Sequence, residues 1–149
     1  MVKRIISGGQ TGADRAGLEA GLSLGIPIGG HCPKGYLAED GQVPQQYGLT
    51  PTASADYRER TRLNVRNADA TVVFTFGPLT SGSRLTVRTA MSLQRPVLHV
   101  DLRSPDSEAK VRAFLATHKP EVLNVAGSRE SRAHGIFEAA RTVLLHTLT

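Results

Sequence analysis

The stretch IISGGQTGADRAGLEAG, residues 5–21, decides the fold. An apolar start runs into two glycines and a Gln-Thr-Gly, and a helical pattern follows. Ala13, Gly17 and Gly21 recur every four residues, which places small side chains on one side of that helix and lets it lie close against a sheet. The stretch predicts a strand, a turn and a helix. The turn is either a plain connection or a cradle for a phosphate group.

The same alternation continues along the chain. We expect helices at 11–25, 54–69, 81–94, from Ser104 onward and at 134–148, and strands at 2–7, 26–30, 70–77, 95–102 and 121–127. Residues 33–52 show little periodicity and predict a long irregular loop, which favours a functional role. The order predicts a single domain over residues 1–149. Its fold class is α/β, with a doubly wound, mostly parallel, Rossmann-like sheet and helices on both faces.

Composition is typical of a globular protein, with 40% hydrophobic and 21% charged residues. No apolar run approaches the roughly 18 residues that a membrane span needs, and the N-terminus does not resemble a signal peptide. We therefore expect no membrane association and a cytoplasmic location. The single cysteine, Cys32, and the absence of zinc-type spacing predict no structural metal. Cys32 is either a buried small hydrophobe or a sulfur ligand at a pocket mouth.

The net charge of +5 comes mostly from arginine. Guanidinium groups suit phosphate or carboxylate, whether on a polymer or on a small molecule. The chain has no basic tail and no aromatic-rich RNA-binding motif, so we do not expect nucleic acid as the main partner. Arg58, Arg62 and Arg66 fall on one side of their helix and predict a solvated face.

Three predicted strands end in turns of one kind. These turns are Ser7–Gly12, Gly77–Ser83 and Gly127–Ser131, and each leads into a helix. Glycines allow a close backbone approach, and a helix start offers free N–H groups to an anion. The first turn has neither the GxGxxG spacing nor a GK[ST] sequence, which disfavours a standard NAD enzyme and a P-loop kinase. Together the three turns predict a pocket for an anion or a nucleotide.

The helix at 54–69 carries polar residues on a side where packing alone would favour aliphatic ones. Arg60 and Asn64 share this face with Tyr57. Either the face lines a polar crevice, which we favour, or the two side chains bond buried backbone. Asp56 and Glu59 are spaced as a capping box. Asp14 either complements a helix dipole or serves a ribose hydroxyl or a metal.

With these pieces placed, the sequence resembles the family of putative molybdenum carrier proteins, within the Rossmann-like superfamily of the LOG-type phosphoribohydrolases once called lysine decarboxylases. The matching stretches are GGQTGADRAGLEAG (8–21), PKGYLAEDGQVPQQYGL (33–49), DYRERTRLNVRNADATVVF (56–74), SGSRLT (81–86), RPVLHVDL (95–102) and NVAGSRES (124–131). The resemblance implies that the first two turns hold the phosphate of a nucleotide-like ligand. For the carriers, that ligand is taken to be the molybdenum cofactor, a pterin bearing a phosphate.

The resemblance carries the phosphate role onto Gly8, Gly9, Gln10, Thr11, Gly12, Gly82 and Ser83. Asp14, Arg60 and Asn64 complete the predicted binding set. The expected ligand is the molybdenum cofactor or another phosphate-bearing nucleotide. Superfamily resemblance also suggests a homo-oligomer, a dimer or a tetramer.

One position departs from the hydrolytic relatives. Thr86 stands where their PGGxGTxxE motif has its glutamate, and a hydroxyl cannot replace that carboxylate. We therefore expect binding without turnover and assign no catalytic residue. The alternative is a hydrolase or transferase acting on a nucleotide-derived molecule, with Asp14, Glu39, Asp40 or Glu130 as its carboxylate. The pair Glu39-Asp40 is otherwise expected to be a solvated turn.

Overall fold

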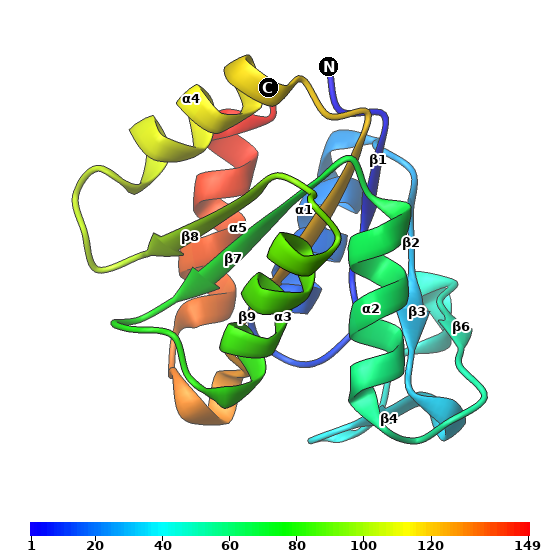
Figure 1. Ribbon diagram of the computed structural model, residues 1–149. Coiled ribbons are helices and arrows are strands. Elements are labelled where there is room, and N and C mark those ends of the chain that lie inside the picture. The colour runs from blue at the N-terminus through cyan, green and yellow to red at the C-terminus, as the bar shows by residue number, and fades with distance from the viewer.

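The computed structural model describes residues 1–149 and has a five-stranded sheet at its centre (Figure 1). All neighbouring strands pair in parallel, in the order β2-β1-β9-β7-β8. The bounds are β1 Arg4–Ile6, β2 Ile28–Gly29, β7 Ala70–Thr75, β8 Val97–Asp101 and β9 Val122–Gly127. The last strand in sequence, β9, lies between β1 and β7, so the strand order reverses at the middle of the sheet. The predicted α/β, doubly wound fold is confirmed.

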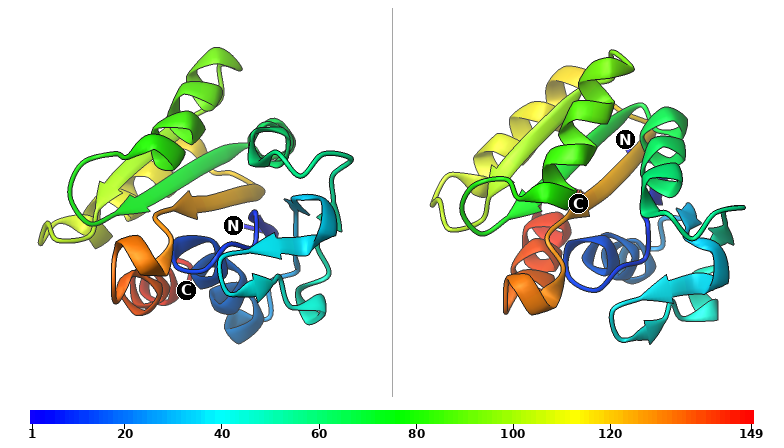
Figure 2. Two further views of the ribbon diagram at one scale, coloured as in Figure 1. Left: turned by 90° about the horizontal axis from the view of Figure 1, so that it is seen from below. Right: turned by 60° about the horizontal axis from the view of Figure 1, so that its bottom comes forward.

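Helices cover both faces of this sheet, as Figure 2 shows from two further directions. One face carries α1 (Ala13–Leu24), α4 (Ser107–His118) and α5 (Ile136–Thr147), and the other carries α2 (Tyr57–Asn67) and α3 (Ser81–Ser92). All six residues of β7 are buried, which explains its uninterrupted apolar and β-branched sequence. None of the helices combines the length and apolar character that a bilayer crossing requires.

The small-residue side of α1 packs directly on the sheet, as predicted. A Cβ atom added to Gly17 would lie 2.6 Å from Cβ of Val125 in β9. A Cβ on Gly21 would meet Cγ2 of Ile28 at 2.5 Å. Only glycine leaves room for helix and sheet to approach this closely.

The capping box predicted for α2 does not form. Asp56 is the N-cap residue, but its carboxylate accepts a hydrogen bond from the N–H of Arg58 at 2.9 Å. The bond is therefore one residue short of the Glu59 position that a capping box uses. Because Asp56 caps the helix, α2 begins at Tyr57 and not at residue 54.

The stretch 33–52 is not an irregular loop. With the preceding residues it forms two small sheets, in which β3 (His31–Cys32) pairs with β6 (Thr50–Pro51) and β4 (Leu37–Ala38) pairs with β5 (Gly41–Gln42). Strands of two residues leave no periodicity in a sequence, which is why the prediction was wrong. This segment has its own apolar cluster, made of Leu18, Cys32, Val43, Tyr47 and Leu49. Cys32 is fully buried there as a small hydrophobe, and burial raises the pKa of its thiol.

Candidate functional site

The three predicted turns meet at the carboxyl edge of the sheet. A cavity of about 100 Å³ lies between them, the N-terminus of α3 and the side of α2. Its polar lining includes Gln10, Asp14, Tyr57, Arg60, Thr61, Thr80, Ser81, Gly82, Ser83, Thr86, Ser128, Arg129 and Arg132. In parallel sheets ligands collect at such a reversal of strand order. Five of the predicted binding residues therefore come together here: Gln10, Asp14, Arg60, Gly82 and Ser83.

The second turn presents the start of α3 to this cavity. Thr80 is the N-cap, and its N–H donates to Oγ of Ser83 at 2.9 Å. The Ser83 hydroxyl in turn donates to the carbonyl of Thr80 at 3.1 Å, so this buried side chain serves the cap. No atom lies within 4 Å of where a Cβ of Gly82 would stand. The first turn of α3 thus offers unpaired backbone N–H groups and the positive end of a dipole to open space.

Buried Asp14 and partly buried Arg60 form an ion pair in the lining of the cavity. Oδ2 of Asp14 lies 3.4 Å from Nη1 of Arg60 and accepts a hydrogen bond from the N–H of Gln10 at 3.1 Å. Burial raises the pKa of Asp14, although the charge of Arg60 opposes the rise. Nε of Arg60 is buried without a hydrogen-bond partner.

Gly8 makes room for this arginine. A Cβ atom on Gly8 would stand 2.0 Å from Nη1 of Arg60, so the guanidinium lies directly against the backbone of the first turn. The glycine is therefore required by Arg60, whatever ligand the cavity holds.

The third turn adds two more arginines. Gly127 has φ 146°, and a Cβ there would lie 2.0 Å from the carbonyl oxygen of Phe74. The N–H of Ser128 donates to the same oxygen at 3.0 Å, which fixes the turn to β7. Arg129 and Arg132 follow, are exposed, and take part in none of the ion pairs of the structure. The cavity therefore has three arginines around it against one carboxylate.

The remaining residues of the first turn do not line this cavity. Gly9 has φ +78°, and a Cβ there would meet Leu49 and Val43 at 2.8 Å each. Gly12 has φ +83°, and a Cβ added to it would lie 2.4 Å from the carbonyl oxygen of Ser128. The Thr11 hydroxyl donates to Glu39 and accepts from the N–H of Glu130 at 3.2 Å. These residues join the first turn to its neighbours.

Glu39 and Asp40 fasten the 33–52 segment to this edge of the sheet. Asp40 receives two hydrogen bonds from the guanidinium of Arg15, at 2.5 and 2.7 Å, which hold the pKa of that carboxyl below its usual range. Glu39 accepts from the hydroxyl and the N–H of Ser131 at 2.5 and 3.2 Å. Burial alone would raise the pKa of Glu39, but the bonds from Ser131 and Thr11 outweigh it and lower that pKa. Both carboxylates are exposed yet paired, and neither lines the cavity.

The two polar residues of α2 have different roles. The Oδ1 atom of Asn64 accepts from the N–H of His31 at 2.8 Å, and its Nδ2 donates to the His31 carbonyl at 3.0 Å. Asn64 thus bonds backbone and holds β3 against α2, whereas Arg60 lines the cavity. Arg60 therefore fits the interpretation that this helix face lines a polar crevice, and Asn64 fits the one in which it bonds buried backbone.

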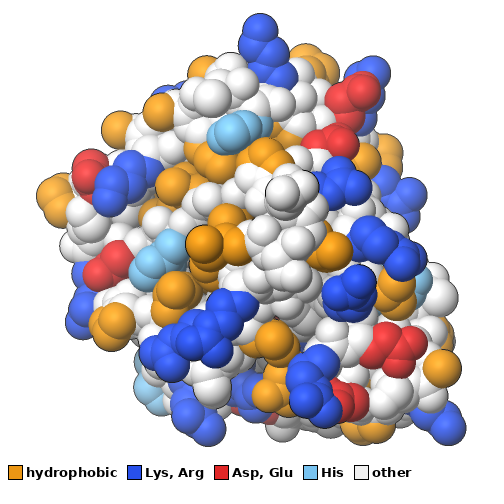
Figure 3. Space-filling view, viewed as in Figure 1, with side chains coloured by type: hydrophobic (Ala, Val, Ile, Leu, Met, Phe, Trp, Pro, Cys, Tyr) orange, Lys and Arg blue, Asp and Glu red, His pale blue; other side chains and the backbone are white.

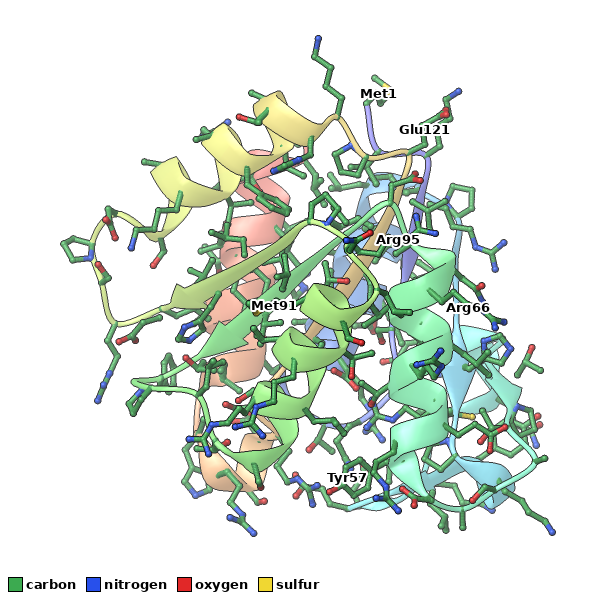
Figure 4. The ribbon with its side chains drawn as sticks, in the orientation of Figure 1. Met1, Tyr57, Arg66, Met91, Arg95 and Glu121 are labelled. Atoms are coloured by element: carbon green, nitrogen blue, oxygen red, sulfur yellow. The ribbon has the colours of Figure 1, made fainter.

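Ten of the 15 lining residues lay outside the predicted set, and three of these, Arg129, Arg132 and Tyr57, add a charge or an aromatic ring. Arg129 lies in the predicted third turn, and its position directly after Gly127-Ser128 could have identified it as a cavity residue. Arg132 follows in a short 3₁₀ turn, Glu130–Arg132, that carries no sequence signature. Tyr57 is 47% exposed at the first residue of α2, where Figure 4 labels it. An aromatic ring at this rim offers a stacking surface to a planar ligand.

The chemistry of this face favours anions. Figure 3 views the side of the molecule that carries α2 and α3, where Lys and Arg side chains outnumber acidic ones. No group of three or more His, Cys, Asp and Glu side chains that could hold a metal ion occurs in the structure.

Comparison with known proteins gives two matches. The model of the circularly permutated YpsA SLOG family matches residues 5–148. A crystal structure named "Putative molybdenum carrier protein", from Syntrophus aciditrophicus SB, is similar with a TM-score of 0.96 and 40% sequence identity. The match covers 99% of this chain and 96% of that one. No curated protein matches the chain.

Proposed function

Since the chain belongs to the circularly permutated YpsA SLOG family, we propose that it is a binding protein for a small phosphorylated ligand, a nucleotide or a phosphorylated pterin. The carrying observation is the cavity at the carboxyl edge, where Arg60, Arg129 and Arg132 surround the first turn of α3. Guanidinium groups and free helix N–H groups are the donors that phosphate oxygens prefer.

The cavity, of about 100 Å³, has room for the phosphate, and the planar ring of the ligand lies outside it at the rim. The phosphate lies against Ser81 and Gly82 at the start of α3, with Arg129 and Arg132 beside it. The ring stacks near Tyr57 at the rim. Gln10 lines the cavity too, and its side-chain oxygen already accepts from the N–H groups of Thr11 and Glu39, at 3.0 and 2.9 Å. It contributes a fixed amide to the wall.

The name of the similar crystal structure makes the molybdenum cofactor a candidate ligand. The residues present fit its pterin ring and phosphate in the way just described. No cysteine lines the cavity, because Cys32 is buried in the cluster beside α1. The protein would therefore hold the cofactor through its organic part, and no cysteine of the cavity would supply a thiolate to the molybdenum.

The position of Thr86 supports binding without turnover. Its side chain is buried at the cavity, and its hydroxyl donates to the carbonyl of Gly82 at 3.4 Å. A threonine bonded within α3 has no charge to stabilise an oxocarbenium-like centre and is no effective base for water.

One observation favours a second candidate, a hydrolase or transferase acting on a nucleotide-derived molecule. Asp14 is a buried carboxyl that lines the cavity, and burial raises its pKa. Raised carboxyl pKa values are typical of general acids and bases. Glu39 and Asp40 are held in other bonds, and Glu130 caps the start of α5 by accepting from the N–H groups of Gly135 and Phe137, at 2.6 and 3.0 Å. Asp14 is therefore the carboxylate that this candidate uses.

Calorimetry with AMP, GMP and a pterin phosphate tests the binding function. We expect at least one ligand to bind, and Arg129→Gln to weaken it while Arg66→Gln, on the outer side of α2, leaves affinity unchanged. Absence of binding across the panel would contradict the proposal. Product analysis after incubation with AMP and ADP-ribose separates the two candidates, since turnover that Asp14→Asn abolishes would establish the enzyme.

Assembly and location also belong to this proposal. We propose a homodimer or homotetramer that acts in the cytoplasm. Size-exclusion chromatography with light scattering measures the assembly, and a monomeric mass would contradict it.

A further inference from the structure

A second cavity, of about 300 Å³, lies at the opposite edge of the sheet, where β1 and β9 begin and α2 ends. It shares no residue with the cavity at the carboxyl edge. Its lining combines four polar side chains with two aliphatic ones: Arg4, His31, Thr50, Asn67, Ile6 and Val122. No acidic side chain lines it.

The histidine of this cavity lacks a partner. Nδ1 of His31 is buried and has no hydrogen bond, which is an unfavourable state for a ring nitrogen. The atom has almost no exposed surface, so a ligand in the cavity reaches it only when the imidazole turns. Asn64 hydrogen-bonds both the N–H and the carbonyl of His31. These two bonds fix β3 in place and keep the imidazole beside the cavity. Thr50 pairs with His31 in the β3–β6 register, which places the hydroxyl and the imidazole on the same face of that small sheet.

The arginine of this cavity is free of ion pairs. Arg4 takes part in none of the salt bridges of the structure. Its guanidinium lies against Gly29, where an added Cβ would stand 2.3 Å from Nη2. The backbone of β2 therefore positions this exposed side chain at the cavity without neutralising its charge.

Two aliphatic side chains form the apolar part of the lining. Arg4 and Ile6 lie two residues apart in β1 and point to the same face of the sheet, and Val122 is the register partner of Arg4 in β9. Asn67, the last residue of α2, closes the polar side. One cation thus stands beside a small apolar patch, with neutral hydrogen-bonding groups around it.

From this arrangement we propose that the cavity binds a small organic carboxylate. The planar guanidinium of Arg4 matches a carboxylate in shape and in charge, one positive for one negative. The Thr50 hydroxyl and the Asn67 amide supply further hydrogen bonds, His31 joins them when its imidazole turns, and Ile6 and Val122 contact the carbon chain. A phosphate group carries more charge than a single arginine balances, and the three arginines at the other edge suit it better.

Nuclear magnetic resonance with propionate as the probe tests this site. Titration of ¹⁵N-labelled protein is expected to shift the amide signals of residues 29–31 and 48–50 in a saturable way, with millimolar affinity. Arg4→Gln should weaken binding about tenfold, since it removes the charge-assisted bonds. His31→Ala should also weaken it. Arg66→Gln is the matched control, because Arg66 is an exposed arginine of α2 outside the cavity and should change nothing (Figure 4).

Each other result overturns the assignment. Shifts that are absent, or that Arg4→Gln leaves unchanged in a correctly folded variant, remove the site. Inorganic phosphate binding here as tightly as propionate removes the carboxylate specificity. AMP affinity should be the same in Arg4→Gln and in the wild type, so this test succeeds or fails separately from the proposed function at the carboxyl edge.

Discussion

The first turn and the second turn of the carboxyl edge look alike in sequence and differ in what surrounds them. The first turn, Ser7–Gly12, is enclosed by the 33–52 segment and the third turn, and side chains or backbone atoms stand wherever a Cβ would be added to its glycines. The second turn leaves Gly82 with no atom within 4 Å. Glycines in the first turn serve close packing, and so does Gly77 in the second, where a Cβ would lie 2.4 Å from Nη2 of Arg103, whereas Gly82 leaves space open beside the cavity.

The difference teaches that a glycine-rich turn alone does not mark a phosphate site. What separates the two turns is the chemistry that faces the cavity. The first turn contributes Gln10 and the start of α1 contributes Asp14, whereas the proposed phosphate donors come from α3 and from Arg60, Arg129 and Arg132. The following predictions test this division of roles, beginning with the largest effect.

Exchanging one glycine in each turn for alanine separates packing from open space. Gly12→Ala forces a Cβ to within 2.4 Å of a carbonyl oxygen at φ +83°, and should lower the free energy of unfolding by about 3 kcal/mol. Gly82→Ala has room and a helical position, and should leave stability unchanged or raise it by up to about 1 kcal/mol. Urea denaturation measures both. Equal losses in the two variants would contradict the contrast between the turns.

Arginine substitutions at the cavity should weaken ligand binding and leave the fold intact. Arg129→Gln removes an unpaired charge, so affinity for the phosphorylated ligand should fall about tenfold, or about 1.4 kcal/mol. Unfolding free energy should stay within about 0.5 kcal/mol of the wild type, because the side chain is exposed and unpaired. Calorimetry and denaturation on the same preparation check both. A stability loss with unchanged affinity would assign Arg129 to packing.

The sequence predicted the sheet well because its signals are local. β7 is a continuous apolar run and α1 has a repeated stripe of small residues, and both patterns appear in the structure as expected. The prediction for residues 33–52 was wrong because the two-residue strands of this segment depend on contacts with α1 and with each other. No local pattern reports such contacts.

The location of the candidate site was predictable from the sequence, but the residues that line it were less so. The common chemistry of the three turns located the cavity, and helix geometry placed Arg60 on its wall. Thr11 and Asn64 look like ligand donors in sequence, yet their hydrogen bonds go to Glu39 and to the backbone of His31. A sequence shows which groups can donate, and only the fold shows which partners already occupy them.

The buried carboxyl of Asp14 should give stability a pH dependence of unusual sign. Its folded pKa is raised above the ordinary value of 3.8, so the folded state binds its proton more tightly than the unfolded state does. Its contribution to stability is therefore largest at low pH and declines as pH rises from 3.8 toward the raised pKa. The unfolding free energy of Asp14→Asn, relative to the wild type, should increase across that window. A flat difference would contradict the raised pKa.

The smallest effect is expected at the clamp between Asp40 and Arg15, which holds the 33–52 segment over the first turn. Asp40→Asn should lower stability by about 0.5–1 kcal/mol, because the pair is bidentate but the Asp40 side chain is 48% exposed. Glu121→Gln, in the more exposed pair with Lys3, is the matched control and should have less effect. The folded pKa of Asp40 is lowered, so its contribution is present at neutral pH and is lost as pH falls through that pKa, the opposite sign to Asp14. Hydrogen exchange should show the loss first in residues 33–52, and an effect spread evenly over the sheet would mean that the clamp does not act locally.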